Sequence, residues 1–114
     1  MSRQRLSLSL WSTLIISTLL SPFSSAETPA FTLRIKDHLF DPSRLVVPAN
    51  VKFKLIIDNQ DPTPEEFESF ELNREKVIIG GQRGTVFIGP LRPGEYPFFG
   101  EFNPKSAQGV IVAE

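Results

Sequence analysis

Two stretches of the chain alternate between apolar and polar residues, and this period-two pattern restricts the fold more than any other feature. In residues 31–36, Phe, Leu and Ile alternate with Thr, Arg and Lys. In residues 51–58, apolar residues again occupy every other position. Successive side chains of a β-strand point to opposite faces, so each stretch predicts a strand with one face directed into a core.

Short apolar segments separated by Pro, Gly, Asn and Asp fill most of the remaining sequence. Further strands are expected at residues 45–47, 85–88 and 110–112, and residues 72–76 are compatible with one helical turn. Turn signals recur every eight to twelve residues, roughly the spacing of small β-sandwiches. The pattern therefore predicts an all-β fold, a small antiparallel Greek-key β-sandwich of about seven strands.

Tyr96 follows the Pro93-Gly94 turn by two residues. Greek-key sandwiches often place a tyrosine near such a corner, where its hydroxyl bonds to nearby backbone. Tyr96 is therefore expected to have a structural role.

Residues 1–26 have the order of features found in a secretory signal peptide. Arg3 and Arg5 form a basic start, residues 6–20 are free of charge, and small residues end the segment at Ala26. The apolar core of about 15 residues is shorter than the roughly 20 needed to cross a bilayer. We predict cleavage after Ala26, a periplasmic domain of residues 27–114, and no insertion into lipid after cleavage.

The charge and cysteine content of residues 27–114 exclude several classes of function. This segment carries 10 basic and 13 acidic residues, a formal charge of −3, which argues against nucleic acid as a partner. The chain has no cysteine, so disulfide support, thiol redox chemistry and thiolate copper ligation are all excluded. The sequence also lacks HExxH, GxSxG and glycine-rich phosphate motifs, and its single histidine gives no sign of a hydrolase.

Two strings resemble the cupredoxins, which are small copper-binding β-sandwiches of the periplasm and secreted space. They are FDPSRLVVPAN at residues 40–50 and PGEYPFFGEF at residues 93–102. In that family a Cys, a His and a Met of the last loop bind copper, and these positions are Gly100, Asn103 and Gln108 in this chain. The resemblance implies a cupredoxin-like fold, but a type 1 copper site is not expected. The remaining family ligand, a His, falls near Glu66.

A narrower resemblance links the chain to the EfeO-type branch of cupredoxin-like domains. It is carried by DNQDPTPEEFES at residues 58–69, LNREKV at 72–77 and AQGVIVAE at 107–114. The branch occurs in periplasmic components of bacterial iron-uptake systems that work with a high-affinity iron permease. The resemblance implies carboxylate-rich binding of an iron or copper ion and a role in handing iron on or oxidising it. The residues themselves do not lead us to expect an enzyme, and a ferroxidase-type activity would follow from this resemblance alone.

The oxygen-bearing side chains around the two loops are the candidate metal ligands. A cupredoxin-like fold would bring the loop after Asp58 and the loop 100–108 to the same end, and oxygen ligands suit hard cations. The predicted metal ligands are Glu66 and Glu101, supported by Glu68, Asn103 and Gln108. Glu65 is a further possible donor, whereas His38 is expected to have a surface or capping role and could act as a ligand only from the opposite side. The glutamates also fit the solvated face of an edge strand, where charge prevents aggregation.

The sequence is compatible with two functions. The first is an exported accessory of iron uptake that binds iron or copper weakly through carboxylates and serves a permease. The alternative is a metal-free docking module that contacts a periplasmic or membrane partner through the aromatic stretch 98–102.

Overall fold

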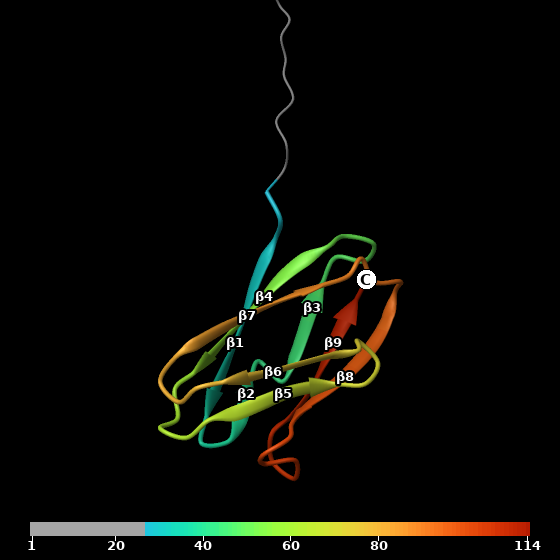
Figure 1. Cartoon of the computed structure of the whole chain (residues 1–114). Coiled ribbons are helices and arrows are strands. Elements are labelled where there is room, and N and C mark those ends of the chain that lie inside the picture. The colour runs from blue at the N-terminus through green and yellow to red at the C-terminus, as the bar shows by residue number, and fades with distance from the viewer. Residues whose placement is uncertain (1–26) are drawn as a thin grey trace, which may run out of the picture.

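The computed structural model describes residues 27–114, which form nine strands and no helix (Figure 1). The strands are β1 (Ala30–Lys36), β2 (Leu39–Asp41), β3 (Arg44–Val47), β4 (Phe53–Asn59), β5 (Glu65–Ser69), β6 (Arg74–Ile78), β7 (Arg83–Ile88), β8 (Gly94–Gly100) and β9 (Gln108–Ala113). The predicted signal peptide, residues 1–26, lies outside the described residues. Within residues 27–114, no helix is long and apolar enough to cross a membrane.

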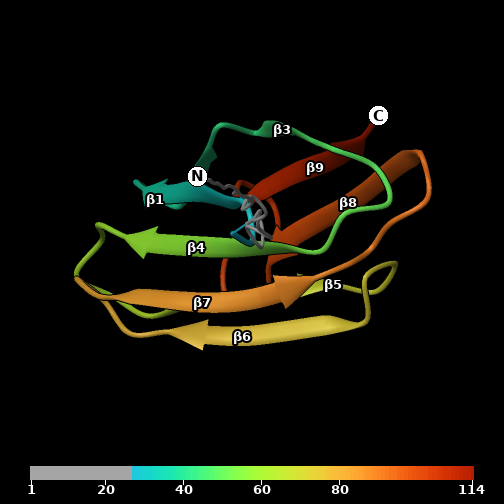
Figure 2. The same cartoon turned by 90° about the horizontal axis from the view of Figure 1, so that it is seen from above.

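The strands form two sheets packed face to face, which confirms the predicted β-sandwich. The first sheet has the order β2-β1-β4-β7 and the second the order β3-β9-β8-β5-β6. Figure 2 shows β4 beside β7 in one layer and β8 beside β9 in the other.

The core lies between the sheets and is built from the alternating residues of both. Phe53, Leu55 and Ile57 of β4 are fully buried, whereas the residues between them are half-buried. Phe40, Phe67 and Phe98 form an aromatic cluster, with Phe98 4.9 Å from Phe40 and 5.2 Å from Phe67 between ring centroids. Large aromatic side chains supply much of the buried area that a domain of this size needs.

The strand pairing differs from the prediction in two respects. Nine strands form rather than about seven, and β1 pairs with β4, and β3 with β9, in parallel. These parallel pairs arise because the chain leaves the first sheet after β2, contributes β3 to the second sheet and then returns as β4. The helical turn considered for residues 72–76 is wrong, because Arg74–Ile78 is β6 and pairs with β5 along its whole length.

Tyr96 has the predicted structural role. Its hydroxyl donates a 2.7 Å hydrogen bond to the backbone oxygen of Arg92, across the turn that leads into β8. This bond fixes the corner at which the chain enters the last hairpin.

Candidate functional site

Of the connections at one end of the sandwich, which we call the loop end, three carry the predicted ligands or lie next to them. They are the β1–β2 turn, the β4–β5 loop (residues 60–64) and the β8–β9 loop (residues 101–107), all in the lower part of Figure 1. Ser106 Oγ donates to the backbone oxygen of His38 at 2.9 Å, which joins the first connection to the third. The predicted meeting of the β4–β5 and β8–β9 loops is confirmed.

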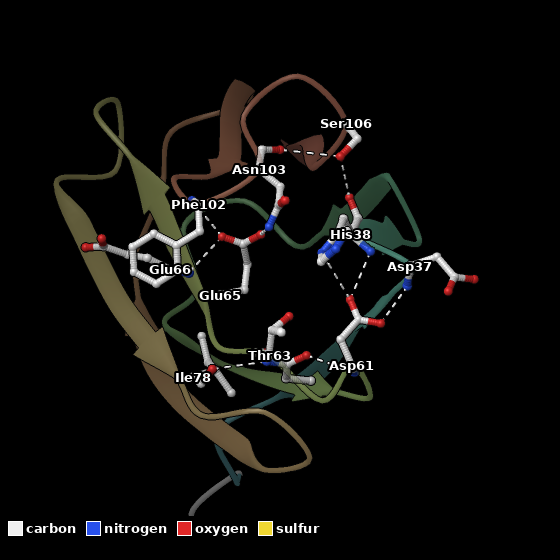
Figure 3. Close-up of polar contacts among 11 residues, drawn as sticks. Asp37, His38, Asp61, Thr63, Glu65, Glu66, Ile78, Phe102, Asn103 and Ser106 are labelled. Carbon is white, nitrogen blue, oxygen red and sulfur yellow. Dashed lines mark hydrogen bonds and ion pairs between the residues drawn. The ribbon is translucent and has the colours of Figure 1, made fainter.

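Glu65, the first residue of β5, places its carboxylate inside the loop end (Figure 3). Only 1% of the residue is exposed. Its Oε1 accepts 2.9 Å hydrogen bonds from the backbone N–H groups of Glu66 and Phe102, and its Oε2 accepts a 2.8 Å bond from Nδ2 of Asn103. Charge-assisted bonds of this kind offset the large cost of removing a carboxylate from water.

Asp61 forms a second buried carboxylate network on the opposite side of the loop end. It accepts backbone hydrogen bonds from Asp37 at 2.7 Å and His38 at 2.9 Å, two residues with positive φ angles of 54° and 60°. Burial alone would raise the pKa of Asp61. The backbone N–H groups of His38 and Asp37, together with electrostatic attraction to the His38 and Lys36 side chains, outweigh burial, so the pKa of Asp61 is lowered.

Asn59 ties the same loop to the neighbouring strand. Its Nδ2 donates to the backbone oxygens of Thr63 at 2.9 Å and Ile78 at 3.1 Å, and its Oδ1 accepts from the backbone N–H of Asp61 at 3.0 Å. Full use of these polar atoms keeps the loop in one conformation.

On the outer face of the second sheet, beside the loop end, lies a group that we call the acidic cluster: Glu66, Glu68 and Glu75. One carboxylate oxygen of each lies within 4.8 Å of one of each of the others. The alternation of β5 turns Glu65, Phe67 and Ser69 inward and leaves Glu66 and Glu68 on the outer face. Because Glu68 pairs directly with Glu75 on β6, the third carboxylate comes from the neighbouring strand.

The members of the acidic cluster repel one another. Partial burial raises the pKa of Glu66, and a side-chain hydrogen bond to Glu75 and the charges of Glu68, Glu75 and Glu101 raise it further. Partial burial also raises the pKa of Glu68, together with the charges of Glu75 and Glu101. The ion pairs found within residues 27–114 include none of the three cluster residues.

The structure brings some of the predicted ligands together and separates others. Glu66 and Glu68 lie in the acidic cluster, and the backbone N–H of Glu101 donates to the backbone oxygen of Glu66 at 2.8 Å. Asn103 turns its amide inward to Glu65, whereas Gln108 is exposed and donates from Nε2 to the backbone oxygen of Pro104.

Two residues of the candidate site were not singled out from the sequence. Glu75 was not among the predicted ligands, because only the pairing of β5 with β6 places it opposite Glu68. Glu65 was named only as a further donor, although period-two alternation places it on the face of β5 opposite to Glu66. The apolar residue Phe67, two positions after Glu65 and therefore on the same face of the strand, could have indicated that this face points into the core, where Phe67 is buried.

Comparisons with known proteins agree with the fold. The chain matches the cupredoxin-like domain family over residues 7–113. It is 45% identical over 80 residues to uncharacterized protein RP394 of Rickettsia prowazekii (strain Madrid E), a match that covers 70% of this chain but only 64% of that protein.

Among solved structures, a copper binding protein studied in its apo form superposes with a TM-score of 0.68 at 18% identity, covering 81% of this chain and 93% of that one. Auracyanin A, a blue copper protein from Chloroflexus aurantiacus, superposes with a TM-score of 0.66 at 11% identity, covering 77% of this chain and 100% of that one. At such low identities, these likenesses concern the fold alone. The two packed sheets and the family match over nearly the whole chain lead to one conclusion: the protein belongs to the cupredoxin-like domain family.

Proposed function

We propose that this protein is an exported accessory of iron uptake that binds an iron or copper ion weakly on its outer face and passes it to a permease. The observation that carries the metal part of the proposal is the acidic cluster, in which three carboxylate oxygens from two strands lie within 4.8 Å of one another. The iron-uptake part rests on the resemblance to the EfeO-type branch.

The chemistry of the acidic cluster suits a hard or borderline cation. Carboxylate oxygens are the ligands that such cations prefer, and Cu(II) also accepts them. Partial burial, and after it the negative charge of neighbouring carboxylates, raises the pKa of Glu66 and of Glu68, and a cation placed between the carboxylates would relieve the repulsion. Glu101 adds a fourth negative charge nearby.

Weak binding follows from the exposure of the cluster. Glu75 is exposed and Glu66 and Glu68 are half-buried, so water competes for the ion and the side chains are not held rigidly. A site of this kind exchanges its ion readily, as a carrier that hands on its cargo must.

The test is calorimetric titration of the purified protein with Cu(II), Fe(III) and Zn(II). Glu66→Gln, Glu68→Gln and Glu75→Gln should each weaken binding by at least about tenfold, because each removes a ligand and a charge. Glu101→Gln should have a smaller effect, through its charge alone. The matched control is Glu95→Gln, which neutralises a glutamate of the same sheet that faces Arg44. A folded protein that takes up none of the three metals would refute the metal-binding part of the proposal.

The export part of the proposal has its own test. The N-terminus of the protein recovered from the periplasm should be Glu27, following removal of residues 1–26. Recovery of the intact chain from the cytoplasm would contradict it.

One observation favours the alternative function, a docking module. Phe70 is 74% exposed, and its ring lies 5.5 Å from that of Phe99, while Phe102 is 50% exposed at the neighbouring loop. Phe98, which belongs to the predicted contact stretch, lies in the core instead. Phe70→Ser should weaken binding to a purified iron permease by at least about tenfold and leave metal binding unchanged. Unchanged binding to the permease would exclude this surface.

A further inference from the structure

The position at which the cupredoxin fold places its copper thiolate does not fit a metal ligand in this chain. The residue there is Gly100, which is buried. A Cβ atom added to Gly100 would lie 2.6 Å from Cδ and 2.7 Å from Oε2 of Glu65, and 2.7 Å from Cβ of Ala107. The volume that a side chain at position 100 would need is therefore already filled, mainly by the carboxylate of Glu65.

Two of the three donors around that carboxylate come from the loop that carries metal ligands in copper-binding relatives. Phe102 contributes its backbone N–H, and Asn103, at the position of the family's histidine ligand, contributes its side-chain amide. A metal ion at this place would have to displace these hydrogen bonds and would find a glycine where the fold supplies a thiolate. The interior of the loop end is thus built around hydrogen-bond donors directed at a carboxylate.

We infer that Glu65 takes the structural place of the metal ion. Its carboxylate fastens the β8–β9 loop to the start of β5 through Phe102 and Asn103, and so closes the loop end in the absence of any metal. This role goes beyond the proposed function, because that function uses the outward-facing carboxylates of the acidic cluster. Glu65 is accordingly a positioning residue for the loop and not a ligand of the transported ion.

Amide hydrogen exchange followed by NMR tests the inference, with the N–H of Phe102 as the main probe. Glu65→Ala should accelerate exchange at Phe102 by at least about tenfold, because the acceptor of this N–H is lost. Glu101→Gln is the matched control, since it neutralises a carboxylate of the same loop that makes none of these bonds. Equal exchange at Phe102 in the wild type and in Glu65→Ala would overturn the inference.

A second pair of variants serves if Glu65→Ala does not fold. Glu65→Gln retains one oxygen for the backbone donors but turns an NH2 group towards Nδ2 of Asn103. Adding Asn103→Asp restores a donor–acceptor pair with the roles exchanged, so the double variant should recover slow exchange at Phe102 relative to Glu65→Gln. Failure of the double variant to recover any protection would count against the inference.

Hydrogen exchange measured with added metal distinguishes the role inferred for Glu65 from metal binding by the acidic cluster. Addition of Zn(II), which is diamagnetic and so leaves the amide signals observable, should leave exchange at Phe102 in the wild type unchanged within about twofold, even if the acidic cluster binds the ion. Strong protection of Phe102 by metal, lost in Glu65→Gln, would show that the loop end is itself a metal site. Absence of metal binding by calorimetry would leave the exchange results unaffected, so the two ideas fail independently.

Discussion

Glu68 and Glu75 are direct cross-strand partners in the β5–β6 ladder, so two carboxylates lie side by side on the outer face of the second sheet. Like charges in this arrangement destabilise a sheet. A change that removes the repulsion between Glu68 and Glu75 should therefore alter both the stability of the folded protein and the affinity of the acidic cluster for a cation.

Glu75→Lys should raise stability and weaken metal binding together. A lysine opposite Glu68 converts repulsion into attraction, and the midpoint of thermal unfolding in metal-free buffer should rise by roughly 1–5 °C. Glu71→Lys makes the same charge change on an exposed residue outside the cluster and should alter the midpoint less. A lower midpoint for Glu75→Lys would mean that the pair is not repulsive in the folded protein.

The acidic cluster should also give stability a distinctive dependence on pH. The pKa values of Glu66 and Glu68 are raised above their ordinary value of 4.5, so just above pH 4.5 the folded state binds more protons than the unfolded state. The contribution of these groups to the free energy of unfolding is therefore fully present below that pH and is lost as pH rises through their folded pKa values. Urea titrations between pH 4 and 8 should show this loss in the wild type, and it should shrink in the Glu66→Gln/Glu68→Gln variant.

Asp61 should give the free energy of unfolding the opposite dependence on pH. Its pKa is lowered from 3.8, so its stabilisation is present above that value and is lost as pH falls through the folded pKa. At neutral pH, Asp61→Asn should lower the free energy of unfolding by about 1–3 kcal/mol, because an NH2 group replaces one acceptor of the buried N–H groups. The difference from the wild type should diminish in acid. Asp58→Asn, which weakens an ion pair with the exposed Arg83 and an exposed hydrogen bond from Gln60, should cost less than about 1 kcal/mol.

Phe98→Ala should be among the most damaging single changes in the core. Phe98 is buried between Phe40 and Phe67, and removing its ring leaves a cavity beneath the loop end. The free energy of unfolding measured in urea should fall by about 3–5 kcal/mol. Phe87→Ala is the control, because this half-exposed ring lies on the outside, and it should cost clearly less.

Much of the fold could be predicted because alternation and turn chemistry are local properties. The pattern at Phe53, Leu55 and Ile57 indicated a strand with one buried face, and these residues are fully buried in the sandwich. The parallel pairings were not predictable from those patterns, because they depend on which sheet each strand joins. The same limitation concealed β6, whose residues are exposed except for Ile78 and so show no clear alternation.

The candidate site, too, was only partly predictable from the sequence. The sequence by itself determined that this chain has no thiolate for copper and that carboxylates gather at residues 65–68, since both facts follow from residue identity. Only the tertiary structure decided that Glu65 points inward to Asn103 and that Glu75 joins Glu66 and Glu68 outside. The reason is physical: the direction of each side chain is set by the pleat of β5, and its neighbours are supplied by strands and loops distant in the chain.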